Sequence, residues 1–168
     1  PFPYIAQMRA ALAPFGIKTG AQTLSSFEKG KYTGEVTAEA LRDLSEYAIV
    51  GHSERRSNFN ETEEELQKKI NLAVAQDIRP ILCVRGDSDK IYTTAAMIAY
   101  EPVAAIGTGH NENPETVVAT KYRCNLPSGM PFLYGGSVNE TNIKEYLQTG
   151  EIDGFLVGSA SLKAEQCM

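Results

Sequence analysis

Short apolar runs alternate along this chain with stretches in which apolar residues recur every three or four positions. The runs expected to form buried strands are residues 17–22, 47–51, 81–84, 97–100, 132–134 and 155–157. Between them, helical spacing predicts helices that begin near residue 3 and after the capping residues Thr37, Thr62 and Asn139. Strands that alternate with amphipathic helices indicate a parallel sheet covered by helices, which is an α/β fold.

The clearest helix signal follows Thr62. Thr62 and Glu65 have the spacing of a capping box, in which each side chain binds the backbone amide of the other. The expected apolar stripe consists of Leu66, Ile70, Ala73 and Val74. The expected pairs four residues apart are Glu64 with Lys68 and Glu65 with Lys69. We therefore expect this charge run to be a solvated face.

Composition adds a few exclusions. The 168 residues suffice for a single domain, residues 1–168, with a hydrophobic core. Sixteen basic against 21 acidic residues give a net charge of −5 without a basic run, which argues against nucleic acid and membrane surfaces as partners. A small anion held by backbone amides stays compatible with this charge. No apolar run reaches membrane-spanning length, and no signal peptide is expected.

The cysteines indicate a reducing, cytoplasmic setting. Cys83, Cys124 and Cys167 are odd in number and lack CxxC or metal-ligand spacing, so neither a disulfide framework nor a zinc site is expected. Cys83 is most simply a small buried strand residue.

Glu101 is the first candidate for chemistry. It follows the apolar run 97–100, and Pro102 cannot continue the hydrogen bonding of a strand, so the carboxylate should lie at the carboxyl end of that strand. A carboxylate placed there can act as a base. The uncharged loop behind it suits a lid that folds over a ligand. The alternative is an acidic residue that ends a strand before an ordinary loop.

Other polar groups follow neighbouring strands. His52 and Glu54 come after run 47–51, and glycine-rich turns follow the last two runs. Such turns can hold a phosphate through backbone amides, although each alone could be a plain tight turn, and His52 alone could be a structural histidine. Ligands of parallel α/β folds bind at this edge of the sheet. Together, a base, an imidazole and a phosphate site indicate proton abstraction next to a carbonyl in a phosphorylated substrate.

These segments resemble the triosephosphate isomerase family. The resembling segments, in family order, are AQTLSSFEKGKYTGEV at 21–36, YAIVGHSERR at 47–56, ILCV at 81–84, AYEPVAAIGTG at 99–109, LYGGSV at 133–138 and DGFLVGSASL at 153–162. The resemblance implies a TIM (β/α)8 barrel, represented here by about six β/α units. It also implies interconversion of dihydroxyacetone phosphate and D-glyceraldehyde 3-phosphate through an enediol(ate), in glycolysis and gluconeogenesis, without a metal or organic cofactor.

The resemblance assigns roles residue by residue. Glu101 is the base, and neutral His52 polarises the carbonyl. The supporting residues are Ser53, Glu54 and Arg55. The phosphate-binding residues are Gly107, Ser137, Gly158 and Ser159. The lid residues are Pro102, Val103, Ala104, Ala105, Ile106, Thr108 and Gly109. Thr33 is the tip of a loop inserted into a neighbouring subunit, so a homodimer is implied.

Several departures from the family pattern accompany the resemblance. The family's first strand, which carries a catalytic lysine, has no counterpart, because Pro1 aligns just after the second strand. Residues 85–96 and 114–131 are shorter than expected for a helix with its connections, and barrels of this type seldom have fewer than roughly 200 residues. We therefore expect the 168 residues to be an N-terminally incomplete subset of a longer protein. Ala104 replaces the family's usual tryptophan, whereas Ser159 replaces a glycine but keeps its amide.

Two alternatives to an active isomerase are compatible with parts of the sequence. A catalytically inactive truncated homologue would retain only phosphate or partner binding, and the absence of the lysine favours it. A different phosphate-binding barrel, such as a sugar-phosphate epimerase, does not account for GHSERR at 51–56 together with the lid motif.

Overall fold

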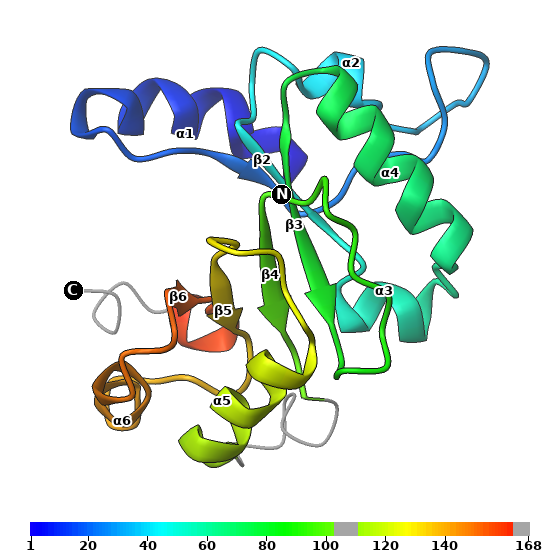
Figure 1. Cartoon of the computed structure of the whole chain (residues 1–168). Helices are drawn as coiled ribbons and strands as arrows, with labels where there is room; N and C mark the ends of the chain where they lie inside the picture. Colours follow the sequence, from blue (N-terminus) through cyan, green and yellow to red (C-terminus); the bar gives the residue numbers. More distant parts are fainter. Residues whose placement is uncertain (103–110, 163–168) are drawn as a thin grey trace. The chain divides into compact units, whose positions relative to one another are not determined.

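The computed structural model describes residues 1–102 and 111–162. The chain forms two compact units (Figure 1). The first unit comprises Pro1–Leu82 and Thr94–Ala96, and the second comprises Cys83–Thr93 and Met97–Met168.

The first unit contains parallel strands with helices between them. Strand β1 (Gly20–Ala21) pairs with β2 (Tyr47–Val50), and β2 pairs with β3 (Arg79–Val84), whose last two residues belong to the second unit. The helices of this unit are α1 (Ile5–Leu12), α2 (Ala38–Leu41), α3 (Ser53–Asn58) and α4 (Glu63–Ala75), with 3-10 turns at Phe2–Tyr4 and Ala13–Phe15.

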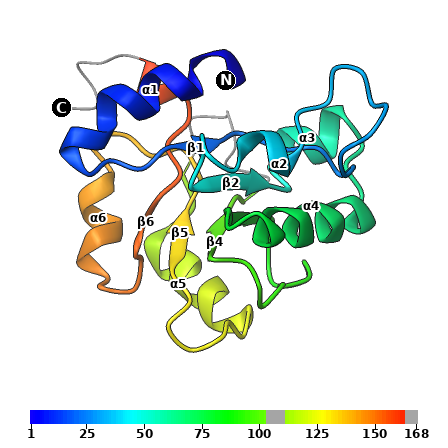
Figure 2. The same cartoon turned by 90° about the horizontal axis from the view of Figure 1, so that it is seen from above.

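Helix α4 forms because its sequence satisfies its own first turn and presents an apolar face. Thr62 caps it with the reciprocal hydrogen bonds of the expected capping box. Its fully buried residues Leu66, Ile70 and Ala73 face the core, and α4 packs against β2 and α2 (Figure 2). The core of this unit therefore lies between α4 and the strands.

Two expectations for α4 were wrong. Val74 is 43% exposed, and Lys69 is only 4% exposed instead of lying on the solvated face. Lys69 follows Leu66 by three residues and precedes Ala73 by four, so it shares their buried side of the helix. Only the Glu64–Lys68 pair forms as expected, with 2.8 Å between Nζ and Oε1.

The second unit contains three more parallel strands. Strand β4 (Met97–Tyr100) pairs with β5 (Phe132–Tyr134), and β5 pairs with β6 (Gly154–Phe155). Helices α5 (Pro114–Arg123) and α6 (Ile143–Gln148) follow β4 and β5, and a 3-10 turn at Ser159–Leu162 follows β6. The core of this unit is rich in aromatic rings, with the rings of Tyr134 and Tyr146 stacked at 4.5 Å.

Differences from the expected elements are concentrated in the first and last strands. β1 and β6 are two residues long, and the apolar residues expected to extend them, Ile17 and Val157, are 54% and 40% exposed. Within the described residues each of these strands pairs on one side only, so fewer backbone bonds hold it extended. Helix α6 starts four residues after Asn139, which instead binds the amides of Thr141 and Asn142.

The short connection at 85–96 behaves as its length indicates. β3 ends at Val84, β4 begins at Met97, and no helix lies between them. Over residues 1–102 and 111–162, none of the helices has the length and apolar character that a membrane span requires.

Candidate active site

Glu101 lies directly after β4, as the sequence predicts. Its amide donates a hydrogen bond to the carbonyl of Val84 (2.8 Å), and the carbonyl of Tyr100 accepts one from the amide of Gly135 (2.7 Å). The peptide group between Tyr100 and Glu101 is therefore held on both sides. Glu101 is only 2% exposed, so its carboxylate starts from a fixed backbone inside the second unit.

The turn after β5 passes against the side chain of Glu101. A Cβ atom added at Gly135 would lie 3.0 Å from Cγ of Glu101 and 3.3 Å from the carbonyl oxygen of Tyr100. Contacts this short are rare for real Cβ atoms, so glycine permits the close approach. The sequence identified this turn as glycine-rich, and the structure brings it to the candidate base.

The strand register places the turn after β6 beside the turn after β5. Tyr100 is opposite Tyr134, and Tyr134 is opposite Phe155, while the amide of Leu156 donates to the carbonyl of Tyr134 (3.0 Å). The residues that follow β4, β5 and β6 thus lie at one edge of the same three strands. Glu101, Ser137, Gly158 and Ser159 all belong to these three strand ends.

Local hydrogen bonds hold the backbone of the candidate phosphate-binding turns after β5 and β6. The carbonyl of Ser137 accepts from Nδ2 of Asn142 (2.8 Å). The carbonyl of Gly158 accepts from the amide (3.0 Å) and the hydroxyl (2.7 Å) of Ser161. Gly158 and Ser159 are exposed, and a Cβ at Gly158 would meet no atom within 4 Å. Open space at an ordered backbone turn suits the binding of a small anion.

Part of the predicted lid lies outside the described residues. This applies to Gly107 and to Val103, Ala104, Ala105, Ile106, Thr108 and Gly109, whereas Pro102 is described and buried.

His52 belongs to the first unit, where it begins helix α3. Gly51, in the left-handed region with φ +75°, turns the chain out of β2, and His52 occupies the N-cap position. Its Nδ1 atom accepts a hydrogen bond from the amide of Glu54 (3.3 Å). An Nδ1 atom that accepts a hydrogen bond corresponds to the neutral tautomer, which has its proton on Nε2.

The three residues predicted to support His52 differ in their surroundings. Ser53 is 7% exposed, whereas the side chain of Glu54 is 71% exposed and lies 4.0 Å from His52 Nδ1. Nε of Arg55 donates to Oε1 of the buried Glu61 (3.0 Å), and the Arg55 guanidinium lies over the exposed ring of Phe59.

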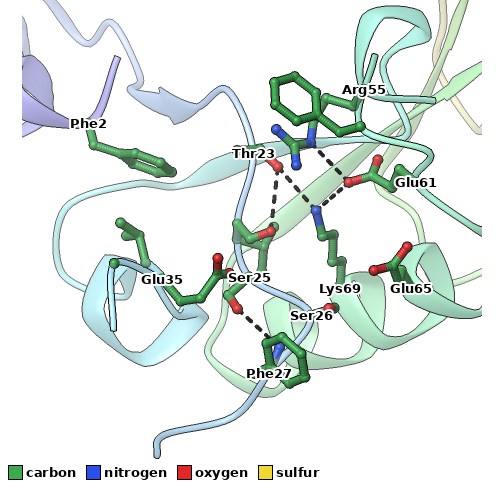
Figure 3. A pocket seen from close by; sticks show the side chains of 14 residues that line it. Phe2, Thr23, Ser25, Ser26, Phe27, Glu35, Arg55, Glu61, Glu65 and Lys69 are labelled. Atoms are coloured by element: carbon green, nitrogen blue, oxygen red, sulfur yellow. Dashed lines mark hydrogen bonds and ion pairs between the residues drawn. The ribbon is translucent and has the colours of Figure 1, made fainter. Parts of the chain in front are cut away.

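Glu61 is a structural residue that the sequence analysis missed. Its carboxylate accepts a hydrogen bond from the amide of Gly51 (3.2 Å). It also accepts hydrogen bonds from Arg55 and Lys69, and Lys69 donates to the hydroxyl of Thr23 (3.3 Å) (Figure 3). Thr23, Arg55, Glu61 and Lys69 help to line a cavity of about 280 Å³ in the first unit. The position of Lys69 on the apolar stripe of α4 was the sequence signal that could have indicated a buried charge, and with it a buried partner such as Glu61.

The protonation of Glu61 follows from this arrangement. Burial alone would raise the pKa of its carboxyl group, but the hydrogen bonds and charges of Lys69 and Arg55 outweigh burial and lower the pKa. Glu61 is therefore a carboxylate that ties the turn carrying His52 to α4.

Thr33 lies in an exposed loop of the first unit. The amide of Ser25 donates to the carbonyl of Val36 (2.9 Å), which closes the base of the loop. Phe27 and Tyr32 stack with ring centroids 4.2 Å apart, and both are 45% exposed. The loop thus presents aromatic surface to solvent.

The part of the chain that the structure describes contains no cluster of side chains that could bind a metal ion. Among those residues, no three His, Cys, Asp or Glu side chains are grouped closely enough to hold a metal ion.

Comparison with known proteins gives consistent matches. The family model for triosephosphate isomerase matches residues 1–95 and 85–168, so the two matched stretches meet at the short connection between β3 and β4. A triosephosphate isomerase from Alkaliphilus oremlandii is 37% identical over 200 aligned positions, which cover 99% of this chain and 81% of the relative. One from Coxiella burnetii is 39% identical, covering 99% and 78%, and one from Dictyoglomus thermophilum is 37% identical, covering 98% and 80%.

Proposed function

The chain belongs to the triosephosphate isomerase family, and from that premise we propose that it interconverts dihydroxyacetone phosphate and D-glyceraldehyde 3-phosphate with Glu101 as the base. Its fold class is α/β of the TIM-barrel type, represented by six strands among residues 1–102 and 111–162, and it is an aldose-ketose isomerase. The observation that carries the assignment of the base is the buried carboxylate of Glu101, which is held at a strand end against Gly135.

The proposed reaction is a proton transfer between adjacent carbons. The carboxylate of Glu101 removes a proton from C1 of dihydroxyacetone phosphate and becomes a carboxylic acid. Nε2–H of His52 donates a hydrogen bond to the carbonyl oxygen, which stabilises the negative charge of the enediolate. The proton of the C1 hydroxyl then moves to O2, Glu101 returns its proton to C2, and the C1–O1 bond becomes the carbonyl of the aldehyde. The neutral tautomer set by the Glu54 amide supports this role for His52.

We propose that backbone amides bind the phosphate of the substrate. Ser137, Gly158 and Ser159 would contribute from the turns after β5 and β6, and Gly107 would contribute from the lid. Glycine-rich turns with open space beside them can hold an anion without basic side chains. This mode of binding agrees with a chain whose net charge is −5.

The direct test is a coupled assay of both reaction directions with the purified chain, combined with titration of inorganic phosphate followed by calorimetry. We expect turnover of both triose phosphates and competitive inhibition by phosphate. Phosphate binding without turnover would instead support the alternative, a catalytically inactive homologue.

We also propose that the protein is a homodimer and that the loop around Thr33 inserts into a neighbouring subunit. The exposed stack of Phe27 and Tyr32 supports this proposal, because exposed aromatic surface is typical of interfaces. The cavity lined by Arg55, Glu61 and Lys69 lies beside the base of the same loop and supplies polar groups for a partner.

A charged side chain at the loop tip should weaken the dimer. In Thr33→Arg an unpaired charge would enter the interface at a cost of about 2 kcal/mol or more, which corresponds to roughly a 30-fold higher dissociation constant. Sedimentation velocity over a concentration series measures this constant. Thr116→Arg is the matched control, because Thr116 is exposed on α5 in the second unit. Equal dissociation constants for the two variants would contradict the proposed role of the loop.

We further propose a cytoplasmic location, with the enzyme acting in glycolysis and gluconeogenesis. The odd number of cysteines and the absence of CxxC spacing support a reducing compartment.

A further inference from the structure

Three tyrosines converge on Glu112, a residue that no sequence pattern singled out. The hydroxyl of Tyr100 donates to its carboxylate (2.7 Å), the hydroxyl of Tyr146 donates to its carbonyl (2.6 Å), and its amide donates to the hydroxyl of Tyr134 (3.1 Å). The three tyrosines are 4%, 1% and 0% exposed, respectively. Glu112 is thus held at its backbone and at its side chain by groups from the core.

The hydrogen bond from Tyr100 to the Glu112 carboxylate involves the residue next to the candidate base Glu101. Tyr100 precedes Glu101, and the peptide group between them is already held by Val84 and Gly135. Two backbone bonds fix the position of this peptide, but they leave the plane free to tilt about the line that joins them. The side-chain bond from Tyr100 to Glu112 adds a third attachment away from that line.

The chemistry of the contact makes it a strong one. A hydrogen bond from a hydroxyl to a carboxylate is about twice as strong as one between neutral groups. Burial, followed by the nearby Glu112 carboxylate, raises the pKa of Tyr100 above its ordinary value, so the hydroxyl keeps its proton and remains a donor. The ring of Tyr100 also packs against the rings of Phe132 and Tyr134, with centroid distances of 6.1 Å and 6.4 Å, and this packing restricts its orientation.

We propose that Glu112, acting through the hydroxyl of Tyr100, is a positioning residue that sets the orientation of the Glu101 carboxylate. This inference rests on the proposed function, because it assigns Glu112 to the reaction in which Glu101 is the base. A carboxylate that must reach two adjacent carbons in turn is sensitive to orientation, and a misplacement of about 1 Å can cost on the order of 100-fold in rate.

The test compares Tyr100→Phe, Glu112→Gln, Glu112→Ala and the double variant Tyr100→Phe/Glu112→Ala. Tyr100→Phe and Glu112→Ala should each lower kcat by roughly 10-fold or more, while KM and the dissociation constant of inorganic phosphate stay within about twofold. Glu112→Gln keeps an acceptor without the charge, so its kcat should lie between those of the parent and Glu112→Ala. The double variant should be no slower than the slower single variant, because both substitutions remove the same contact.

Tyr122→Phe is the matched control. Tyr122, near the end of α5, also bonds a glutamate, Glu151, but Tyr122 is exposed and remote from Glu101 in the chain. Its removal should leave kcat unchanged. Thermal unfolding of every variant separates a lower active fraction from a lower rate per folded molecule.

The outcomes are distinguishable. An active parent with unaltered kcat in Tyr100→Phe and Glu112→Ala overturns the inference alone. Multiplicative losses in the double variant would also overturn it, because they would mean that the two residues act independently. A loss of phosphate affinity equal to the loss of kcat would overturn it as well, because it indicates general damage to the fold. A parent without turnover overturns the proposed function and this inference with it.

Discussion

Replacing Glu101 with glutamine should lower kcat for triose phosphate interconversion by roughly 10²–10⁴-fold, the range that a positioned acid or base contributes. The amide has nearly the same shape as the carboxylate but accepts no proton at neutral pH. Because Glu101 is 2% exposed and its backbone is held on both sides, glutamine should occupy the same place. The loss should therefore appear in kcat, while phosphate binding persists. Steady-state kinetics with phosphate as a competitive inhibitor measures both quantities.

Two further variants sharpen this test. Glu101→Asp keeps a base but moves its carboxyl carbon back by one methylene group, to where Cγ of Glu101 now lies beside Gly135, so its kcat should fall while phosphate binding stays. Glu115→Gln removes an exposed acid from the first turn of α5 and should leave kcat unchanged. Turnover by Glu101→Gln equal to that of the parent would exclude Glu101 as the base.

The largest loss of stability is expected from Glu61→Ala, about 3–5 kcal/mol in the free energy of unfolding. This substitution would leave Lys69, which is 4% exposed, as a buried charge without its carboxylate. It would also remove the acceptor for the amide of Gly51 and one partner of Arg55. Equilibrium unfolding in urea, with the slope checked for two-state behaviour, measures the loss.

The control for Glu61 is Glu64, three residues further along the chain in the first turn of α4. Glu64→Ala breaks the exposed pair with Lys68 and should cost far less stability than Glu61→Ala, because water screens exposed ion pairs. In the double variant Glu61→Gln/Lys69→Met the buried charge is gone as well, so part of the stability should return. A loss in Glu61→Ala no larger than in Glu64→Ala would contradict the proposed role of the cluster.

The pH dependence of stability gives a second readout for Glu61. Its pKa is lowered in the folded protein from the ordinary value of 4.5, because the hydrogen bonds of Lys69 and Arg55 outweigh the effect of burial. The folded state therefore binds this proton less readily than the unfolded state does. Its contribution to stability is fully present above the unfolded pKa and is lost as the pH falls from 4.5 through the folded pKa. The stability of the parent should decline more steeply than that of Glu61→Ala over this acid range.

Loss of Glu61 should also affect catalysis through His52. The amide of Gly51 bonds to Glu61, and Gly51 directly precedes His52. Without this bond the turn out of β2 loses its tie to the buried cluster around α4. Among folded molecules of Glu61→Ala we expect kcat to fall, whereas the dissociation constant for phosphate should stay unchanged.

The sequence by itself determined the features that depend on neighbouring residues. Strands β4 and β5 have the predicted bounds, because apolar runs ended by Glu101-Pro102 and by Gly135-Gly136 have no continuation as strands. The capping box of Thr62 formed as predicted, because both of its bonds lie within one helical turn. Parallel strands have the same direction, so their following residues share one edge, which is why Glu101 and the glycine turns could be assigned to one site in advance.

The helical spacing of Lys69 already indicated the buried side of α4, but only the tertiary structure decided what the buried charged residues contact. Lys69 belongs to a run of charges that is typical of a solvated face, and its contact with Thr23 joins residues 46 positions apart. Tyr100 and Glu112 are 12 residues apart and do not belong to a common helix or strand, so no local sequence pattern predicts their contact. Periodicity reports which side of an element a residue occupies, whereas burial and partners depend on distant segments that fill the space beside it. For that reason the candidate catalytic residues could be found from the sequence, but the residues that hold them could not.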